Sequence, residues 1–376
     1  LESLTPAERY AATKAKGRNP VAATFFETFD FELDDFQKKG CFAIESGKGV
    51  LVAAPTGAGK TIVGEFAAYL ALEKGKKCFY TTPIKALSNQ KYQEFVERFG
   101  EEKVGLLTGD TSINSDADVM VMTTEVLRNM LYTNSSTLLN LGFVVMDEVH
   151  YLADKFRGAV WEEVLIHLME SVQVVSLSAT VSNAEEFGEW LQVVRGDTEV
   201  IVSEVRPVPL YQHVLIGNRL LDLFNEDGSV NQAILRSERE ALRRIRTPKN
   251  RGRADDESRL TRAEIIEKLQ YAQMLPVITF IFSRQGCDSA VKQCLNMNLR
   301  LTSTEEREEI RRVALKYTAN INTEDLELLG HNDWLAALER GIAAHHAGLL
   351  PVFKSCVEEL FQRGLLKAIF ATETLA

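Results

Sequence analysis

The amino-acid sequence predicts an α/β protein made of two domains, each with a parallel β-sheet flanked by helices. Its 376 residues are enough for about two or three domains. Short, almost continuously apolar runs alternate with amphipathic segments, which is typical of buried parallel strands and the helices that cover them. The segment Arg206-Pro207-Val208-Pro209 interrupts this alternation, because proline fits poorly inside helices and sheets. We therefore expect a domain boundary there.

The first half of the chain shows the clearer alternation of strands and helices. Helical patterns lie between most of the apolar runs, for example at residues 62–72 and 86–99. The strands expected in this half are residues 50–54, 78–81, 119–122, 143–146, 174–177 and 200–202. The alternation resumes in the second half, with expected strands at residues 277–282 and 368–370. The second domain is therefore expected to be α/β as well.

These patterns divide the chain into an arm and two domains. Residues 1–28 are polar and mildly basic, so we expect a peripheral N-terminal arm. It is followed by a first domain at residues 29–205 and a second domain at residues 206–376. Within the second domain a basic insertion is expected near residues 231–265, because residues 236–253 include eight Arg or Lys and two Glu. Such a charge run is usually a solvated loop, and a nucleic-acid contact is the alternative.

The composition limits the classes of function. The chain has 43 Lys and Arg against 53 Asp and Glu, a net charge of −10. It is therefore not a uniformly basic nucleic-acid coat, although a local basic groove is compatible with this charge. No apolar run approaches the roughly 18 residues of a membrane span, so we expect no membrane partner. The five cysteines include no Cys-x-x-Cys pair, which predicts reduced, mostly buried thiols of a cytoplasmic protein.

Residues 54–61 have the sequence of a phosphate-binding loop, Ala-Pro-Thr-Gly-Ala-Gly-Lys-Thr. They follow an expected strand and open an expected helix, which is the context that such a loop requires. Its glycines let backbone N–H groups point at phosphate oxygens. Lys60 is expected to reach the β- and γ-phosphates and Thr61 to coordinate Mg²⁺. The predicted ATP ligands are Pro55, Thr56, Gly57, Ala58, Gly59, Lys60 and Thr61.

The apolar strand at residues 143–146 ends in two carboxylates, Asp147 and Glu148. Asp147 is expected to bind Mg²⁺, and Glu148 to orient and deprotonate the attacking water. Acidic residues often end strands as ordinary surface groups, so this pair is a weak signal by itself. Together with the phosphate-binding loop it predicts hydrolysis of a nucleoside triphosphate, with Lys60, Asp147 and Glu148 as the catalytic residues.

Small or polar residues also follow other expected strands of the first domain. In chain order these segments are Thr82-Pro83-Ile84-Lys85-Ala86-Leu87, Thr123-Thr124-Glu125-Val126-Leu127 and Ser178-Ala179-Thr180. The carboxyl ends of parallel strands share one edge of the sheet, where ligands bind. We therefore expect the nucleotide at one part of this edge and a second ligand at another.

The ordered set of motifs resembles that of superfamily-two helicases, specifically the DExH-box superkiller-type branch. This branch includes RNA-exosome-associated helicases and the actinobacterial HelY proteins. Residues 147–150 (Asp-Glu-Val-His) are similar to the box that gives the family its name, and residues 345–351 (His-His-Ala-Gly-Leu-Leu-Pro) to a loop of the branch. Residues 31–37 resemble its adenine-recognition segment, in which Phe31 stacks on the base and Gln37 reads its edge. The resemblance covers about residues 25–376 and implies two tandem RecA-like domains.

The resemblance also implies which residues contact nucleic acid and which transmit the nucleotide state. Contacts with the phosphate backbone position a strand without reading its bases. Ser178 and Thr180 are implied to link the nucleotide to the bound strand, and His150 to help couple the two domains. The implied nucleic-acid contacts are Pro83, Lys85, Thr123, Thr124, Arg128, Ser283, Arg284, Thr372 and Thr374.

These observations predict an ATP-dependent helicase or translocase that acts on single-stranded or partly duplex RNA. A DNA-repair helicase of the same branch and an ATP-dependent RNA clamp that does not unwind remain the alternatives. Members of the branch continue into a Gln-x-x-Gly-Arg-x-Gly-Arg motif whose arginines face the γ-phosphate, and no segment of this sequence matches it. We therefore expect a second domain that is truncated at its C-terminal side, and poor ATP hydrolysis by this chain alone.

Overall fold

The computed structural model describes residues 19–153, 158–179, 184–237, 239 and 260–372. The chain forms two compact units, Leu1–Leu210 and Tyr211–Ala376. The division between them falls just after the proline-containing segment at which the sequence predicts a domain boundary. Each unit is built on its own parallel sheet, with helices on both faces of that sheet.

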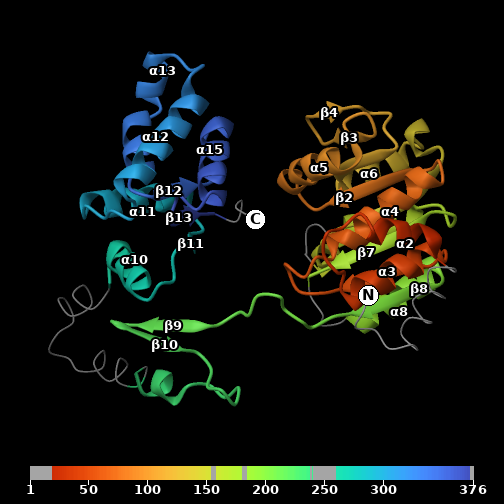
Figure 1. Ribbon diagram of the computed structural model, residues 1–376, viewed down its shortest axis with the longest axis horizontal. Coiled ribbons are helices and arrows are strands. Elements are labelled where there is room, and N and C mark those ends of the chain that lie inside the picture. Colours follow the sequence, from red (N-terminus) through yellow and green to blue (C-terminus); the bar gives the residue numbers. More distant parts are fainter. Residues whose placement is uncertain (1–18, 154–157, 180–183, 238, 240–259, 373–376) are drawn as a thin grey trace. The chain divides into compact units, whose positions relative to one another are not determined.

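The first unit contains an eight-stranded, mostly parallel sheet (Figure 1). Its strands lie in the order β4 (Ser112–Ile113), β3 (Val104–Leu107), β5 (Val119–Thr123), β2 (Lys77–Thr82), β6 (Leu141–Met146), β7 (Gln173–Ser178), β1 (Gly49–Ala53) and β8 (Thr198–Val202). Among the described strands of this sheet, only β3 and β4 pair in the antiparallel sense. The sequence does not predict these two strands, because β3 is short and contains Gly105, and β4 is an exposed edge pair. Every other strand overlaps a predicted one.

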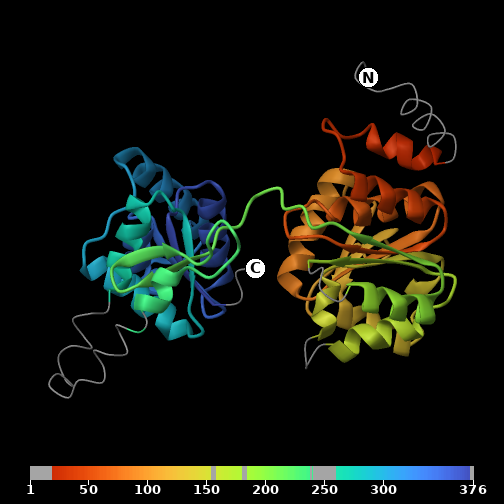
Figure 2. The ribbon, with the colours of Figure 1, turned by 90° about the horizontal axis from the view of Figure 1, so that it is seen from below.

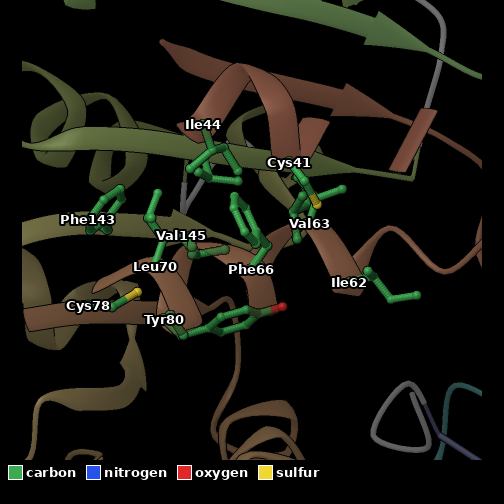
Figure 3. Packing of buried hydrophobic residues seen from close by; sticks show 14 of the residues in the cluster. Cys41, Ile44, Ile62, Val63, Phe66, Leu70, Cys78, Tyr80, Phe143 and Val145 are labelled. Carbon is green, nitrogen blue, oxygen red and sulfur yellow. The ribbon is translucent and has the colours of Figure 1, made fainter. Parts of the chain in front are cut away.

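Helices cover both faces of this sheet (Figure 2). Alternate residues of each strand point to opposite faces, so two separate hydrophobic clusters form. Figure 3 shows part of the first cluster, in which Phe66 packs close to Val145. The helices of the first cluster are α2 (Pro20–Phe26), α3 (Asp35–Glu45), α4 (Thr61–Glu73) and α5 (Lys85–Phe99), and those of the second are α6 (Thr124–Tyr132), α7 (Gly158–His167) and α8 (Ala184–Arg195). The described residues of the unit also include two short 3₁₀ helices, η1 (Ser136–Leu138) and η2 (Val149–Ala153).

Helix α2 belongs to the core of the first unit, so the prediction of a peripheral arm through residue 28 does not hold for it. Phe25 is 0% exposed. Its ring centroid lies 5.1 Å from that of Phe29 and 5.2 Å from those of Phe66 and Tyr69. Large aromatic rings gain much from such burial and from tilted or edge contacts. The polar residues around this short apolar segment conceal it in the sequence.

The second unit contains a three-stranded parallel sheet with the order β11 (Val277–Phe280), β13 (Ala368–Ala371) and β12 (Ile342–His345). An antiparallel hairpin of β9 (His213–Ile216) and β10 (Arg219–Asp222) precedes it. The predicted strand at residues 277–282 ends at Phe280, and β12 and the hairpin are not predicted. One face of the sheet carries α10 (Arg262–Tyr271) and α11 (Arg284–Asn296), and the other α12 (Thr304–Thr318), α14 (His331–Leu338) and α15 (Pro351–Gln362). Helix α13 (Thr323–Leu328) adjoins α14.

Most of the predicted basic insertion lies outside the described residues, which omit 238 and 240–259. Arg236 and Arg239 within it are exposed. The predicted end of the insertion near residue 265 falls inside α10, because Ala263 and Ile266 of that helix are buried in the core. Among the helices of the described residues, none is both long and apolar enough to cross a membrane.

Candidate active site

The predicted phosphate-binding loop connects the end of β1 to the start of α4. Gly57 and Gly59 have φ angles of +83° and +78°, which glycine adopts without a steric penalty. The loop therefore curls between a strand and a helix N-terminus, where backbone N–H groups and the helix dipole favour an anion. The side chain of Lys60, directly before α4, is only 8% exposed. A bound phosphate is the group that this arrangement fits.

Two carboxylates follow β6 and lie at the same edge of the sheet. The backbone N–H of Asp147 donates to the carbonyl of Thr81 at 2.9 Å, so this residue continues the strand pairing. Glu148 then has a φ angle of +53°, which is uncommon for a residue with a Cβ atom and frequent at functional sites. Its Oε1 lies 4.0 Å from Lys60 Nζ, and its Oε2 lies 3.3 Å from His150 Nδ1.

The pKa values of the two carboxyl groups are shifted in opposite directions. Burial raises the pKa of Asp147, and the hydrogen bond from Tyr80 offsets this rise only in part. Burial also raises the pKa of Glu148. Interactions with nearby groups that include His150 and Lys60 lower the same pKa by more than burial raises it. The pKa of Glu148 therefore lies below its usual value. Glu148 is therefore a carboxylate at neutral pH and is able to accept a proton.

Two buried polar atoms of this site, Glu148 Oε2 and His150 Nδ1, face each other at 3.3 Å. Neither atom has a further hydrogen-bond partner among the described residues. A carboxylate oxygen can accept a second hydrogen bond, such as one from a water molecule. The described residues contain no group of three or more His, Cys, Asp or Glu side chains suited to a metal ion. A Mg²⁺ ion held by Thr61 and Asp147 would therefore also need the phosphates of a nucleotide, which is its usual mode of binding.

The predicted adenine-recognition residues lie in and before α3. Gln37 Oε1 accepts the backbone N–H of Asp34 at 2.8 Å, and Gln37 Nε2 donates to the carbonyl of Gly59 at 3.0 Å. Gln37 thus connects α3 to the phosphate-binding loop. Phe31 is 59% exposed, and its ring meets that of Phe29 edge-on at 5.4 Å. An exposed ring that packs against a neighbouring ring is suited to stacking on a base. The stacking of Phe31 on adenine stays a prediction.

The strand ends predicted to bind nucleic acid lie next to one another, because β2 and β5 are neighbours in the sheet. The hydroxyl of Thr124 donates to the carbonyl of Thr82 at 3.2 Å and so joins the two strand ends. Pro83, Thr123 and Thr124 are buried. Their contacts with a phosphate backbone stay predictions.

In the first unit, the two cations predicted to contact nucleic acid are both paired with carboxylates. Lys85 is exposed and forms an ion pair with Asp110, which follows β3. Arg128 of α6 lies with its Nη1 atom 3.7 Å from Glu163 Oε2 of α7. A nucleic-acid phosphate that binds either cation must therefore compete with a carboxylate of the protein.

Ser178 joins the phosphate-binding loop to the rest of this edge. Its backbone carbonyl accepts the N–H of Ala54, the first residue of the loop, at 3.0 Å. Its strand, β7, pairs with both β1 and β6. Ser178 therefore lies between the loop and the carboxylates, as expected of a residue that links them. Thr180, its predicted partner in this role, lies outside the described residues.

In the second unit the predicted nucleic-acid residues also follow neighbouring strands. Ser283 caps α11, its hydroxyl accepting the N–H of Gly286 at 3.1 Å, and Arg284 is exposed. Thr372 follows β13, and its N–H donates to the carbonyl of His345 at 3.1 Å. Because β11 and β13 are parallel neighbours, these residues share one edge of their own sheet. Thr374 lies outside the described residues.

The two histidines at the end of β12 are buried and make side-chain contacts. His345 is 0% exposed and its Nε2 lies 2.8 Å from Glu358 Oε1. His346 Nδ1 accepts the N–H of Gly348 at 3.1 Å, so its Nε2 carries the proton and donates to Asp288 Oδ1 at 2.9 Å.

Sequence reasoning missed one residue of the site, Tyr80. Its hydroxyl donates to Asp147 Oδ2 at 2.6 Å, although the two residues are 67 positions apart. The signal that could have found it is a tyrosine in a strand that is otherwise expected to be wholly buried, because a buried hydroxyl needs a partner.

A phosphate-binding loop, an acidic strand end and small residues on neighbouring strands lie at one edge of a parallel sheet, which is the arrangement of an α/β domain that binds a nucleoside triphosphate. Residues 34–187 match the DEAD/DEAH box helicase family, so the chain contains a helicase domain of that family.

Named proteins resemble nearly the whole chain. It is 56% identical over 370 residues to "Probable helicase HelY" of Mycobacterium leprae. The aligned region covers 94% of this chain and 40% of that protein. It is 35% identical over 404 residues to "Antiviral helicase SKI2" of Saccharomyces cerevisiae (93% of this chain, 31% of that protein). It is 37% identical over 358 residues to "Exosome RNA helicase MTR4" of Homo sapiens (93% and 34%). These similarities confirm the resemblance to the superkiller-type branch, and the chain spans less than half the length of each relative.

Proposed function

We propose that this chain is the ATP-hydrolysing motor portion of a helicase or translocase that acts on RNA. The observation that carries the proposal is the meeting of the phosphate-binding loop with the acidic strand end, where Lys60 Nζ lies 4.0 Å from Glu148 Oε1. RNA is favoured because relatives of the chain include a protein named as an RNA helicase. Since the chain spans only part of its relatives, the activity is proposed for the complete protein.

In this proposal the residues around the loop divide the work of binding and hydrolysis. The loop binds the triphosphate, while Phe31 and Gln37 hold the adenine. Mg²⁺, held through Thr61 and Asp147, would supply positive charge that favours attack at the γ-phosphate. Lys60 neutralises negative charge on the phosphates. Glu148, ionised at neutral pH, orients a water molecule and accepts its proton.

The strand ends beside this site are proposed to bind the nucleic-acid backbone. Lys85 and Arg128 would contact phosphates after exchanging their carboxylate partners, and Ser178 would transmit the nucleotide state to them. His150 would contribute to coupling between the two domains, together with Thr180. The further proposed contacts with nucleic acid are Pro83, Thr123, Thr124, Ser283, Arg284, Thr372 and Thr374.

ATP hydrolysis by the full-length protein, with matched single strands of RNA and DNA, tests the proposal. We expect greater stimulation by RNA than by DNA. Glu148→Gln should retain ATP binding and lose about 10²- to 10⁴-fold in hydrolysis, because the proton acceptor is gone. Stimulation by DNA alone would contradict the proposed substrate, and hydrolysis by Glu148→Gln at the parental rate would contradict the assignment of the base.

Strand displacement distinguishes a helicase from an ATP-dependent clamp. A duplex with a single-stranded extension should be separated by the full-length protein only when ATP is hydrolysed. RNA-stimulated hydrolysis without displacement would favour the clamp.

We also propose that the protein works in the cytoplasm, where its five buried, unpaired cysteines would remain thiols.

A further inference from the structure

Tyr80 forms a buried hydrogen bond with the carboxylate that is proposed to hold Mg²⁺. Its hydroxyl donates to Asp147 Oδ2 at 2.6 Å. The other oxygen of this carboxylate, Oδ1, accepts the backbone N–H of Glu148 at 2.9 Å. We propose that Tyr80 is a positioning residue, which orients Asp147 for Mg²⁺-dependent nucleotide binding. This inference rests on the proposed function.

Packing alone does not explain the hydroxyl of Tyr80. The side chain is 0% exposed and lies in the first hydrophobic cluster, where Figure 3 shows it near helix α4. A phenylalanine would fill almost the same space. Burial of a hydroxyl is unfavourable unless the group is hydrogen-bonded. A phenol that donates to a carboxylate makes a strong, charge-assisted bond, so the contact with Asp147 accounts for a tyrosine at this position.

The ring of Tyr80 is held from two sides, which restricts where its hydroxyl can lie. Phe95 of α5 meets it edge-on, with ring centroids 5.0 Å apart. On α4, a Cβ atom at Gly64 would come within 2.9 Å of Tyr80 Cε2, so the helix backbone is packed against the ring. Helix α4 begins at Thr61, at the end of the phosphate-binding loop. The same packing therefore sets the position of Tyr80 relative to the loop and to Asp147.

Loss of a partner that orients a metal ligand typically lowers metal affinity or activity about 10- to 100-fold. A tyrosine with a purely structural role would give a different result, since its loss would lower stability and leave the requirement for Mg²⁺ unchanged.

The test is the substitution Tyr80→Phe in the full-length protein. Binding of a fluorescent ATP analogue is measured during a titration with Mg²⁺ and, separately, in EDTA. The Mg²⁺ concentration for half-maximal binding should rise about 10-fold or more, while the affinity in EDTA stays unchanged. Tyr317→Phe is the matched control, because the Tyr317 hydroxyl donates to Glu359 Oε2 at 2.8 Å in the second unit. It should leave both measurements at the parental values.

A double-substitution cycle with Asp147→Asn tests whether Tyr80 acts through Asp147. If it does, Tyr80→Phe has little further effect on the Mg²⁺ requirement in the Asp147→Asn background. An equally large effect in that background would overturn the inference, as would a parental Mg²⁺ requirement in Tyr80→Phe. If the parent protein binds nucleotide without any dependence on Mg²⁺, the proposed function fails instead.

Discussion

Removal of the charge of Asp110 should strengthen the binding of RNA. Lys85 is proposed to contact the phosphate backbone, and Asp110 is its ion-pair partner in the structure. A phosphate must displace this carboxylate before it can reach the ammonium group. The substitution Asp110→Asn removes the competing charge and almost conserves the shape of the side chain. The expected result is tighter binding of RNA, whereas damage to the fold would weaken binding.

The expected gain is modest, because both side chains are solvated. The side chain of Lys85 is 44% exposed and that of Asp110 is 68% exposed, and ion pairs between exposed groups contribute little. We expect about twofold to fivefold tighter binding of single-stranded RNA at low salt. The slope of log affinity against log salt should steepen by up to about 0.7, the value for one additional phosphate contact on a single strand.

Fluorescence anisotropy with labelled single-stranded RNA and the full-length protein measures both quantities across a salt series. Asp227→Asn is the matched control, because it removes one exposed negative charge in the second unit. Weaker binding by Asp110→Asn would refute the reasoning and show that Asp110 orients Lys85 for the nucleic acid. Equal gains in the two variants would attribute the effect to net charge.

Two further predictions concern the nucleotide loop and the core. Gly59→Ala should weaken ATP binding, because its φ of +78° costs a residue with a Cβ about 1–2 kcal/mol and that Cβ would lie 2.6 Å from Gln37 Nε2. Calorimetry should show no such loss of ATP affinity for Gly75→Ala, because position 75 has a φ of +60° and no atom within 4 Å of an added Cβ. Equal losses of ATP affinity in the two variants would exclude the contact with Gln37 as the cause. Phe25→Ala should lower the free energy of unfolding of the first unit by about 3–5 kcal/mol, since a fully buried ring is lost. Denaturant unfolding with Thr24→Ala, an exposed position on the same helix, is the comparison, and equal stability of the two variants would exclude α2 from the core.

The strands of the first unit that are apolar along their whole length could be predicted from the sequence. The predicted strand at residues 143–146 corresponds to β6, which extends from Leu141 to Met146 and is buried throughout. The phosphate-binding loop could also be predicted, because its glycines and lysine are consecutive in the chain. Helix α2 could not, since its burial depends on rings contributed by α4, about 40 residues further along the chain.

The sequence by itself determined the helicase motifs, their order along the chain and the edge of the sheet at which they meet, because apolar runs, glycine-rich turns and strand ends are local properties. Only the tertiary structure decided that β2 lies beside β6, which lets Tyr80 reach Asp147 across 67 positions. It likewise placed Asp110 against Lys85 and gave Glu148 its positive φ. These features depend on the order in which strands pair, and that order is set by packing between segments that are distant in the sequence.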